Sequence, residues 1–91
     1  MNYEGLPFEH KHTENGVVRT FSESIDEHEL KWHVDDEDRE ITVLHKTDWM
    51  LQMDDELPQN LIEGEKYYIP KGIYHRVIKG NGDLKISVSF P

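Results

Sequence analysis

The chain has 91 residues, enough for one compact domain with a modest hydrophobic core. Ten Lys and Arg residues against 19 Asp and Glu residues give a formal net charge of −9, so the phosphate backbone of a nucleic acid would be repelled at long range. The chain has no cysteine, which excludes disulfides, thiolate metal sites and cysteine nucleophiles. Any functional site must therefore use His, Asp, Glu, Tyr or hydroxyl side chains.

No stretch approaches the roughly 20 apolar residues of a membrane span, and residues 1–12 lack the basic start and apolar middle of a signal peptide. We therefore expect a cytoplasmic protein with neither a nucleic acid nor a membrane as partner. Residues 1–14 are the least patterned part of the chain and are expected to form an N-terminal arm or a first edge strand. Residues 15–91 are expected to form one folded domain.

Short apolar runs rich in β-branched and aromatic residues alternate with turn formers, which is the pattern of an all-β domain. The predicted strands cover residues 17–22, 28–34, 39–45, 48–53, 59–62, 66–69, 75–79 and 84–90. In the run 39–45, Ile41 and Val43 lie on one face, while Glu40, Thr42 and Leu44 lie on the other. Both faces of this strand therefore need cover. We expect the cover to be a second subunit in a homodimer, with a second sheet of the same barrel as the alternative.

The segment from Gly64 to His75 predicts a hairpin with an unusual turn. Pro70 fixes its own φ angle and pushes the preceding residue into an extended conformation, and Gly72 can adopt a positive φ angle. His75 follows this turn closely and opens the next strand. Its direction is therefore set by the backbone rather than by a mobile loop.

The spacing Gly64-x5-Pro70-x-Gly72-x2-His75 resembles the second conserved motif of the cupin superfamily, in which the histidine binds a metal. The asparagine that ends the family motif is replaced here by Lys79. The first family motif, His-x-His followed by a glutamate, fits at residues 33–40, although glutamate and threonine occupy the flanking glycine positions. The sequence around Trp32 also resembles stand-alone bacterial mini-cupins, to which no reaction is assigned. The resemblance implies a single-domain, all-β, double-stranded β-helix of the jelly-roll or cupin type over residues 15–91.

The same resemblance implies a metal site formed by His33, Asp35, Glu40 and His75. Asp35 stands where the family has its second histidine, and Glu40 stands at the family's glutamate and is a candidate general base. Two imidazoles with one or two carboxylates suit Fe(II), Mn(II), Ni(II) or Zn(II), with positions left open for water and substrate. The alternative is that the histidines are hydrogen-bonded barrel residues without a metal, and that Asp35 belongs to a solvated acidic loop over residues 35–38.

Three functions fit these features. The first is a metal-dependent enzyme of the oxygenase, isomerase or decarboxylase class that acts on a small molecule in the barrel cavity. The second is a non-catalytic binding or sensor protein that uses the same cavity, with or without a metal. The third is a protein-interaction subunit, which would be insensitive to mutation of His33 or His75.

Overall fold

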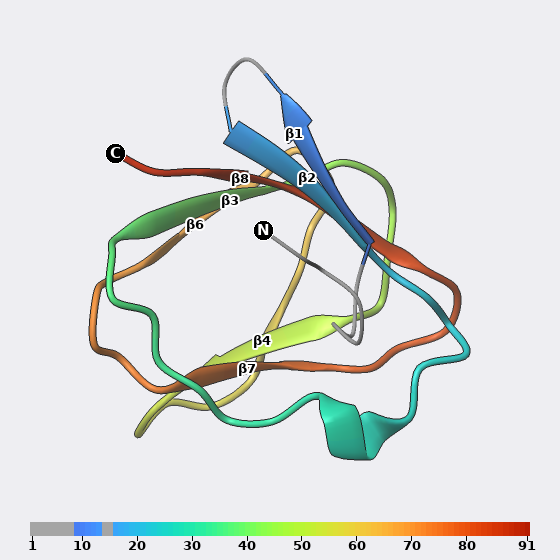
Figure 1. Ribbon diagram of the computed structural model, residues 1–91. Coiled ribbons are helices and arrows are strands. Elements are labelled where there is room, and N and C mark those ends of the chain that lie inside the picture. The colour runs from blue at the N-terminus through green and yellow to red at the C-terminus, as the bar shows by residue number, and fades with distance from the viewer. Residues whose placement is uncertain (1–8, 14–15) are drawn as a thin grey trace.

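The computed structural model describes residues 9–13 and 16–91 of the chain. Within them, eight strands form two antiparallel sheets that face each other (Figure 1). The larger sheet has the order β1-β2-β8-β3-β6 and the smaller one the order β5-β4-β7. The strands are β1 (Glu9–Thr13), β2 (Gly16–Phe21), β3 (Arg39–Val43), β4 (Met50–Met53), β5 (Gln59–Asn60), β6 (Lys66–Ile69), β7 (His75–Ile78) and β8 (Leu84–Ser89).

The strand predicted at residues 28–34 is wrong. The structure has a short 3-10 helix there, η1 (Glu27–Glu29), followed by a single bridge between His33 and β7. The cause is local, because the Asp26 carboxylate accepts hydrogen bonds from the His28 backbone N–H and contacts the His28 ring, each at 2.9 Å. Such side-chain bonds compete with strand pairing. No helix in the described part of the chain is long and apolar enough to cross a membrane.

The hydrophobic core lies between the two sheets. Its most buried large side chains, each less than 2% exposed, are Trp49, Leu51, Leu61, Leu84, Val43 and Val88. The Trp49 indole N–H donates to the Gly82 carbonyl at 2.9 Å, so its polar atom is satisfied inside the core. Trp32, by contrast, is 41% exposed, and the Arg76 guanidinium lies 4.8 Å from its ring centroid.

Strand β3 has the two faces that the alternation predicts. Ile41 and Val43 are 3% and 1% exposed and point into the core, so the smaller sheet of the same barrel lies opposite this face. Glu40 and Thr42 occupy the other face, and Leu44, just beyond the strand, is 41% exposed. The homodimer stays a prediction. β1 is an edge strand of the larger sheet, while residues 1–8 and 14–15 of the predicted arm and its boundary lie outside the described residues.

The Pro70 turn connects the two sheets instead of closing a hairpin within one sheet. β6 pairs with β3 in the larger sheet, whereas β7 pairs with β4 in the smaller sheet. The Ile73 N–H donates to the Pro70 carbonyl at 3.3 Å, and Gly72, the third residue of this turn, has a φ angle of 80°. A positive φ angle at the third residue is what a type II turn requires. The predicted role of Gly72 is confirmed, while the predicted hairpin is wrong.

The Gly72 turn generates a prediction about stability. Gly72→Ala should lower the free energy of unfolding by about 1–2 kcal/mol, because a β-carbon is disfavoured at positive φ even where it meets no neighbouring atom. Gly82→Ala is the matched control, since Gly82 has a φ angle of 73° and equally open surroundings. Chemical denaturation should show similar losses for both variants, and only Gly72→Ala should shift the NMR signals of the His75 ring. Equal shifts in both variants would show that the turn does not position His75.

Candidate metal centre

His75 is the best-fixed residue of the candidate site. It is the first residue of β7 and is 4% exposed, the one buried polar or charged residue among those described. Its ring atom Nδ1 lies 2.9 Å from the Ile73 carbonyl oxygen, two residues back along the chain. The cupin-like turn therefore sets both the backbone and the ring of this histidine.

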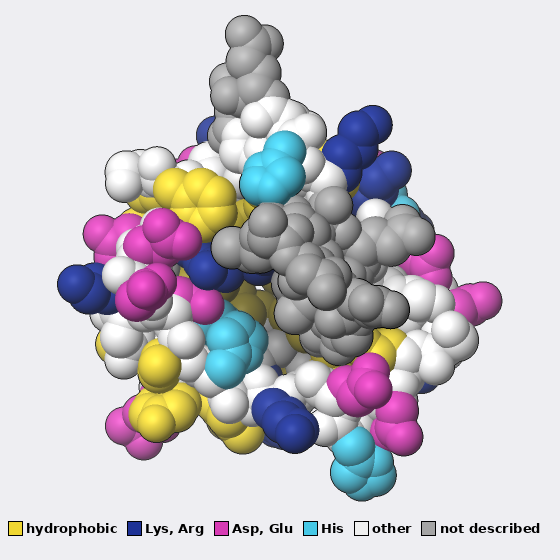
Figure 2. All heavy atoms as spheres, viewed as in Figure 1, with side chains coloured by type: hydrophobic (Ala, Val, Ile, Leu, Met, Phe, Trp, Pro, Cys, Tyr) yellow, Lys and Arg dark blue, Asp and Glu magenta, His cyan; other side chains and the backbone are white. Residues whose placement is uncertain are grey.

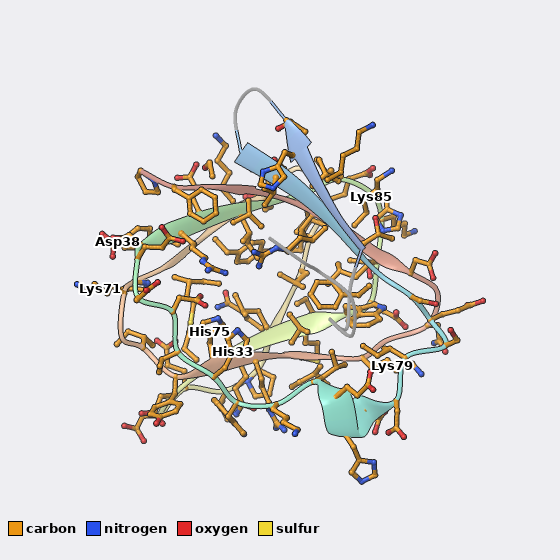
Figure 3. All side chains as sticks on the ribbon, viewed as in Figure 1. His33, Asp38, Lys71, His75, Lys79 and Lys85 are labelled. Atoms are coloured by element: carbon orange, nitrogen blue, oxygen red, sulfur yellow. The ribbon has the colours of Figure 1, made fainter. Side chains whose placement is uncertain are left out.

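His33 lies beside His75, although 42 positions separate them in the sequence. The two residues exchange backbone hydrogen bonds in both directions, each 3.0 Å long, and their ring centroids are 4.2 Å apart. Figure 3 shows His33 and His75 next to each other, and of the two His33 is exposed while His75 is buried. The Nδ1 atom of His33 lies 3.0 Å from the Lys31 carbonyl oxygen, again two residues back. The ring of each histidine is thus held by the backbone carbonyl two residues earlier in the chain.

These carbonyl contacts determine which ring nitrogen is available. A carbonyl oxygen can only accept a hydrogen bond, so Nδ1 of each neutral ring must carry the proton and donate it. The lone pair of each neutral ring then lies on Nε2. Metal-binding histidines are commonly fixed in this way, with one nitrogen donating to a carbonyl and the other free for the metal.

Asp35 supplies the third candidate metal ligand. Its side chain is 8% exposed, with Oδ1 3.3 Å from Nη1 of Arg39 and Oδ2 3.3 Å from Nε2 of His75. Oδ2 is buried and has no hydrogen-bond partner among the described residues. A buried carboxylate oxygen without a donor is costly, and a cation placed between it and the imidazoles would satisfy it.

The acidic loop that carries Asp35 is bound to the Pro70 turn. The Gly72 N–H donates to the Asp35 carbonyl at 3.0 Å, and the Lys71 N–H donates to the Asp38 carboxylate at 2.8 Å. Asp38 and Lys71 lie together at the edge of the barrel in Figure 3. The loop therefore holds Asp35 against the barrel, and the alternative of a merely solvated acidic run does not describe this residue.

Glu40 does not join the other three predicted ligands. It lies on the outer face of β3, with its side chain 39% exposed and its carboxylate 3.5 Å from Nζ of Lys66. The reason is the strand register, because Ile41 and Val43 point inward and Glu40 must then point outward. The expectation that Glu40 is a ligand or a general base in the cavity is corrected accordingly.

The inward position next to Glu40 belongs to Arg39, a residue that the motif spacing does not single out. The period-two alternation of β3 already placed Arg39 on the face of Ile41 and Val43, so this signal was present. The family motif pointed to Glu40 instead, because its spacing requires a glutamate at that position. Both the structure and the alternation of β3 place the cationic side chain of Arg39 at this inward position.

The structure thus brings together His33, Asp35 and His75. Each offers one ligand atom, and these atoms all lie within 4.8 Å of one another, so the group can bind a metal ion. The unpartnered Asp35 oxygen and the free Nε2 positions fit a divalent cation. Two histidines and one carboxylate leave further coordination positions open.

A cavity of about 270 Å³ lies against this group. In the space-filling view it appears as a central hollow with hydrophobic side chains at its base and histidine and basic side chains at its rim (Figure 2). Its volume is just below the 300–1,000 Å³ range of typical ligand pockets, so only a small molecule fits. The apolar lining consists of Phe21, Leu30, Ile41, Leu51, Ile69, Val77, Ile86 and Val88.

Burial is the main reason that the pKa of His75 is lowered from its ordinary value of 6.5, and the neighbouring His33 ring lowers it further. The Ile73 carbonyl and the Asp35 carboxylate act in the opposite direction. The net effect favours the neutral imidazole near neutral pH. A neutral imidazole is the form that binds a metal.

The lowered pKa of His75 predicts how stability depends on pH in protein treated with a chelator. The unfolded chain takes up a proton at about pH 6.5, while folded His75 resists it, so the unfolded state binds more protons just below that pH. The free energy of unfolding should therefore fall as the pH drops below about 6.5. His75→Gln should flatten this profile, and His28→Gln, at an exposed histidine, should not. An unchanged slope in His75→Gln would contradict the burial argument.

Comparisons with known proteins establish the fold. No protein-family model matches the sequence, and neither does any curated protein. Solved structures do match over the whole chain. An RmlC-like cupin family protein with a double-stranded β-helix fold from Methanocaldococcus jannaschii is 15% identical, with a TM-score of 0.67 and 86% of its own chain covered. KdgF from a Halomonas species is 17% identical, with a TM-score of 0.68 and 85% covered, and a cupin domain from Bordetella pertussis Tohama I is 12% identical, with a TM-score of 0.60 and 98% covered. All of these matches cover 100% of this chain, which therefore has the double-stranded β-helix fold of the cupins.

Proposed function

We propose that this protein binds a divalent metal at His33, Asp35 and His75 and uses it to hold a small molecule in the barrel cavity. The observation that carries the proposal is the buried Oδ2 atom of Asp35, which has no hydrogen-bond partner among the described residues and lies 3.3 Å from Nε2 of His75. In a metal-free protein this arrangement leaves a polar atom unsatisfied. A cation shared by the three side chains removes that cost.

The donor set limits the choice of metal. Two imidazoles and a carboxylate suit Fe(II), Mn(II), Ni(II) or Zn(II), and this combination with open positions is typical of non-haem Fe(II) oxygenases. A bound divalent cation would supply Lewis-acid polarisation of a ligand oxygen. The open positions are the property that favours a functional site over a purely structural one.

The residues around the site are suited to binding a small molecule and reacting with it. The apolar walls exclude water and strengthen electrostatic interactions within the cavity. The Nδ1 contacts to the Lys31 and Ile73 carbonyls hold the two imidazoles in one orientation. We propose an enzyme of the oxygenase, isomerase or decarboxylase class on this basis.

A non-catalytic binding or sensor protein is the second candidate. The observation that favours it is the position of Glu40, which removes the predicted general base from the cavity. Turnover of any small molecule that raises the melting temperature of the metal-loaded protein would decide for the enzyme. Ligand binding without turnover across such a set would decide for the binding protein.

Metal titration of the wild-type protein tests the proposal. Isothermal titration with Mn(II), Fe(II), Ni(II) or Zn(II) after chelator treatment should show about one site per chain. His75→Ala and Asp35→Asn should each weaken binding on the order of 100-fold or more, because the first removes a ligand and the second removes the negative charge of another. Circular dichroism should confirm that the variants remain folded.

Two variants serve as matched controls. Glu40→Gln should leave the metal affinity unchanged, since Glu40 faces away from the group, and His28→Ala should do the same, since His28 lies on the exposed 3-10 helix. Absence of metal binding by the wild-type protein would overturn the proposal. A loss of affinity in Glu40→Gln equal to that in Asp35→Asn would place the site elsewhere.

A further inference from the structure

Arg39 is the charged residue that faces the cavity from β3. It shares the inward face with Ile41 and lines the cavity together with His33, Asp35 and His75. Its side chain is 16% exposed, so most of the guanidinium is removed from water. An arginine that is largely removed from water needs acceptors for its five N–H groups.

The described neighbours of Arg39 satisfy it only in part. Nη1 lies 3.3 Å from the Asp35 carboxylate and Nη2 lies 3.5 Å from the Glu37 carboxylate. Both distances exceed the roughly 2.7–2.9 Å of a charge-assisted hydrogen bond. Its Nε atom is buried and has no hydrogen-bond partner among the described residues. The guanidinium therefore keeps unused donor capacity next to the cavity.

The charges around the cavity favour an anion. The basic side chains that line it are Arg19, Lys31 and Arg39, and the acidic ones are Glu29 and Asp35. The difference is 3 − 2 = +1 for these lining residues, and Glu37, which pairs with Arg39 from outside the lining, is not included in this count. A divalent metal would raise this local charge to +3. In an apolar cavity such a charge calls for a compensating anion.

We propose that Arg39 binds the carboxylate of a small organic acid and thereby sets the substrate class of the metal site. This inference rests on the proposed function, because the other end of the acid would lie at the metal. One carboxylate, that of Asp35, spans the gap from Arg39 to His75, with Oδ1 3.3 Å from Nη1 of Arg39 and Oδ2 3.3 Å from Nε2 of His75. A ligand only a few bonds long can therefore contact both places.

The cavity walls specify an organic acid rather than an inorganic anion. Leu51, Ile69 and Val77 line the same cavity as the charged group and can bury a short carbon chain. Inorganic phosphate offers no carbon to these walls. The cavity volume of about 270 Å³ restricts the acid to a small one.

The test uses isothermal titration with 2-hydroxybutyrate, its neutral amide 2-hydroxybutyramide, and inorganic phosphate. Each probe is titrated into the Mn(II)-loaded protein and into protein treated with a chelator. The acid should bind on the order of tenfold or more tightly than the amide in both forms, as expected for a hydrogen-bonded charge pair. Phosphate should bind more weakly than the acid.

Arg39→Gln should abolish the preference for the acid over the amide in chelator-treated protein, where no metal can contribute. Arg39→Lys should keep only part of the preference for the acid, because the lysine ammonium retains the positive charge but lacks the planar N–H groups of the guanidinium. This variant also provides the test if Arg39→Gln does not fold. Arg76→Gln is the control, since Arg76 stacks on exposed Trp32 and does not line the cavity.

The metal affinity separates a binding role of Arg39 from a merely structural one. Loss of the cation beside Asp35 should leave Mn(II) affinity unchanged or tighten it in Arg39→Gln.

Equal binding of the acid and the amide, an intact preference in Arg39→Gln, or phosphate bound as tightly as the acid would overturn the inference. Metal binding without any preference for the acid would sink this inference alone. A preference for the acid in a wild-type protein that binds no metal would sink the proposed function and leave the anion site standing.

Discussion

The pair of backbone hydrogen bonds between His33 and His75 is the contact on which the site depends. Each is 3.0 Å long, and together they attach the segment before the acidic loop to the first residue of β7. They tie the segment that carries His33 and Asp35 directly to the backbone of β7 in the smaller sheet. With them, two imidazoles and a carboxylate converge from distant parts of a 91-residue chain.

The Pro70 turn and the acidic loop reinforce this contact from the other side. Backbone N–H groups of Lys71 and Gly72 donate to Asp38 and Asp35, so turn and loop form one hydrogen-bonded unit. The barrel then supplies apolar walls from both sheets. In a small domain with a modest core, positioning of this kind has to come from hydrogen-bonded loops as well as from side-chain packing.

Much of the fold was predictable from the sequence, because alternation and turn formers are local signals. Seven of the predicted strands overlap strands of the structure, and Gly72 has the positive φ angle expected of it. The strand predicted at residues 28–34 failed because the Asp26 carboxylate starts a 3-10 helix. The predicted hairpin failed because the partners of β6 and β7 are strands distant in sequence, and short-range patterns do not specify them.

The site was predictable where a motif and the strand register agreed, and not where they disagreed. His33, Asp35 and His75 come from the family motifs, and the structure places them together. Glu40 was selected by motif spacing alone, although the alternation around Ile41 favoured its neighbour Arg39 for the inward position. The orphaned Asp35 oxygen could not be foreseen, since it depends on the three-dimensional arrangement of Arg39 and His75.

Anomalous diffraction from crystals of the metal-loaded protein tests the metal site at His33, Asp35 and His75 most directly. We expect one anomalous peak among the three side chains, roughly 2.0–2.2 Å from Nε2 of His33, from Nε2 of His75 and from an oxygen of Asp35. A peak coordinated by Glu40, or a metal bound only at surface side chains away from His75, would contradict it.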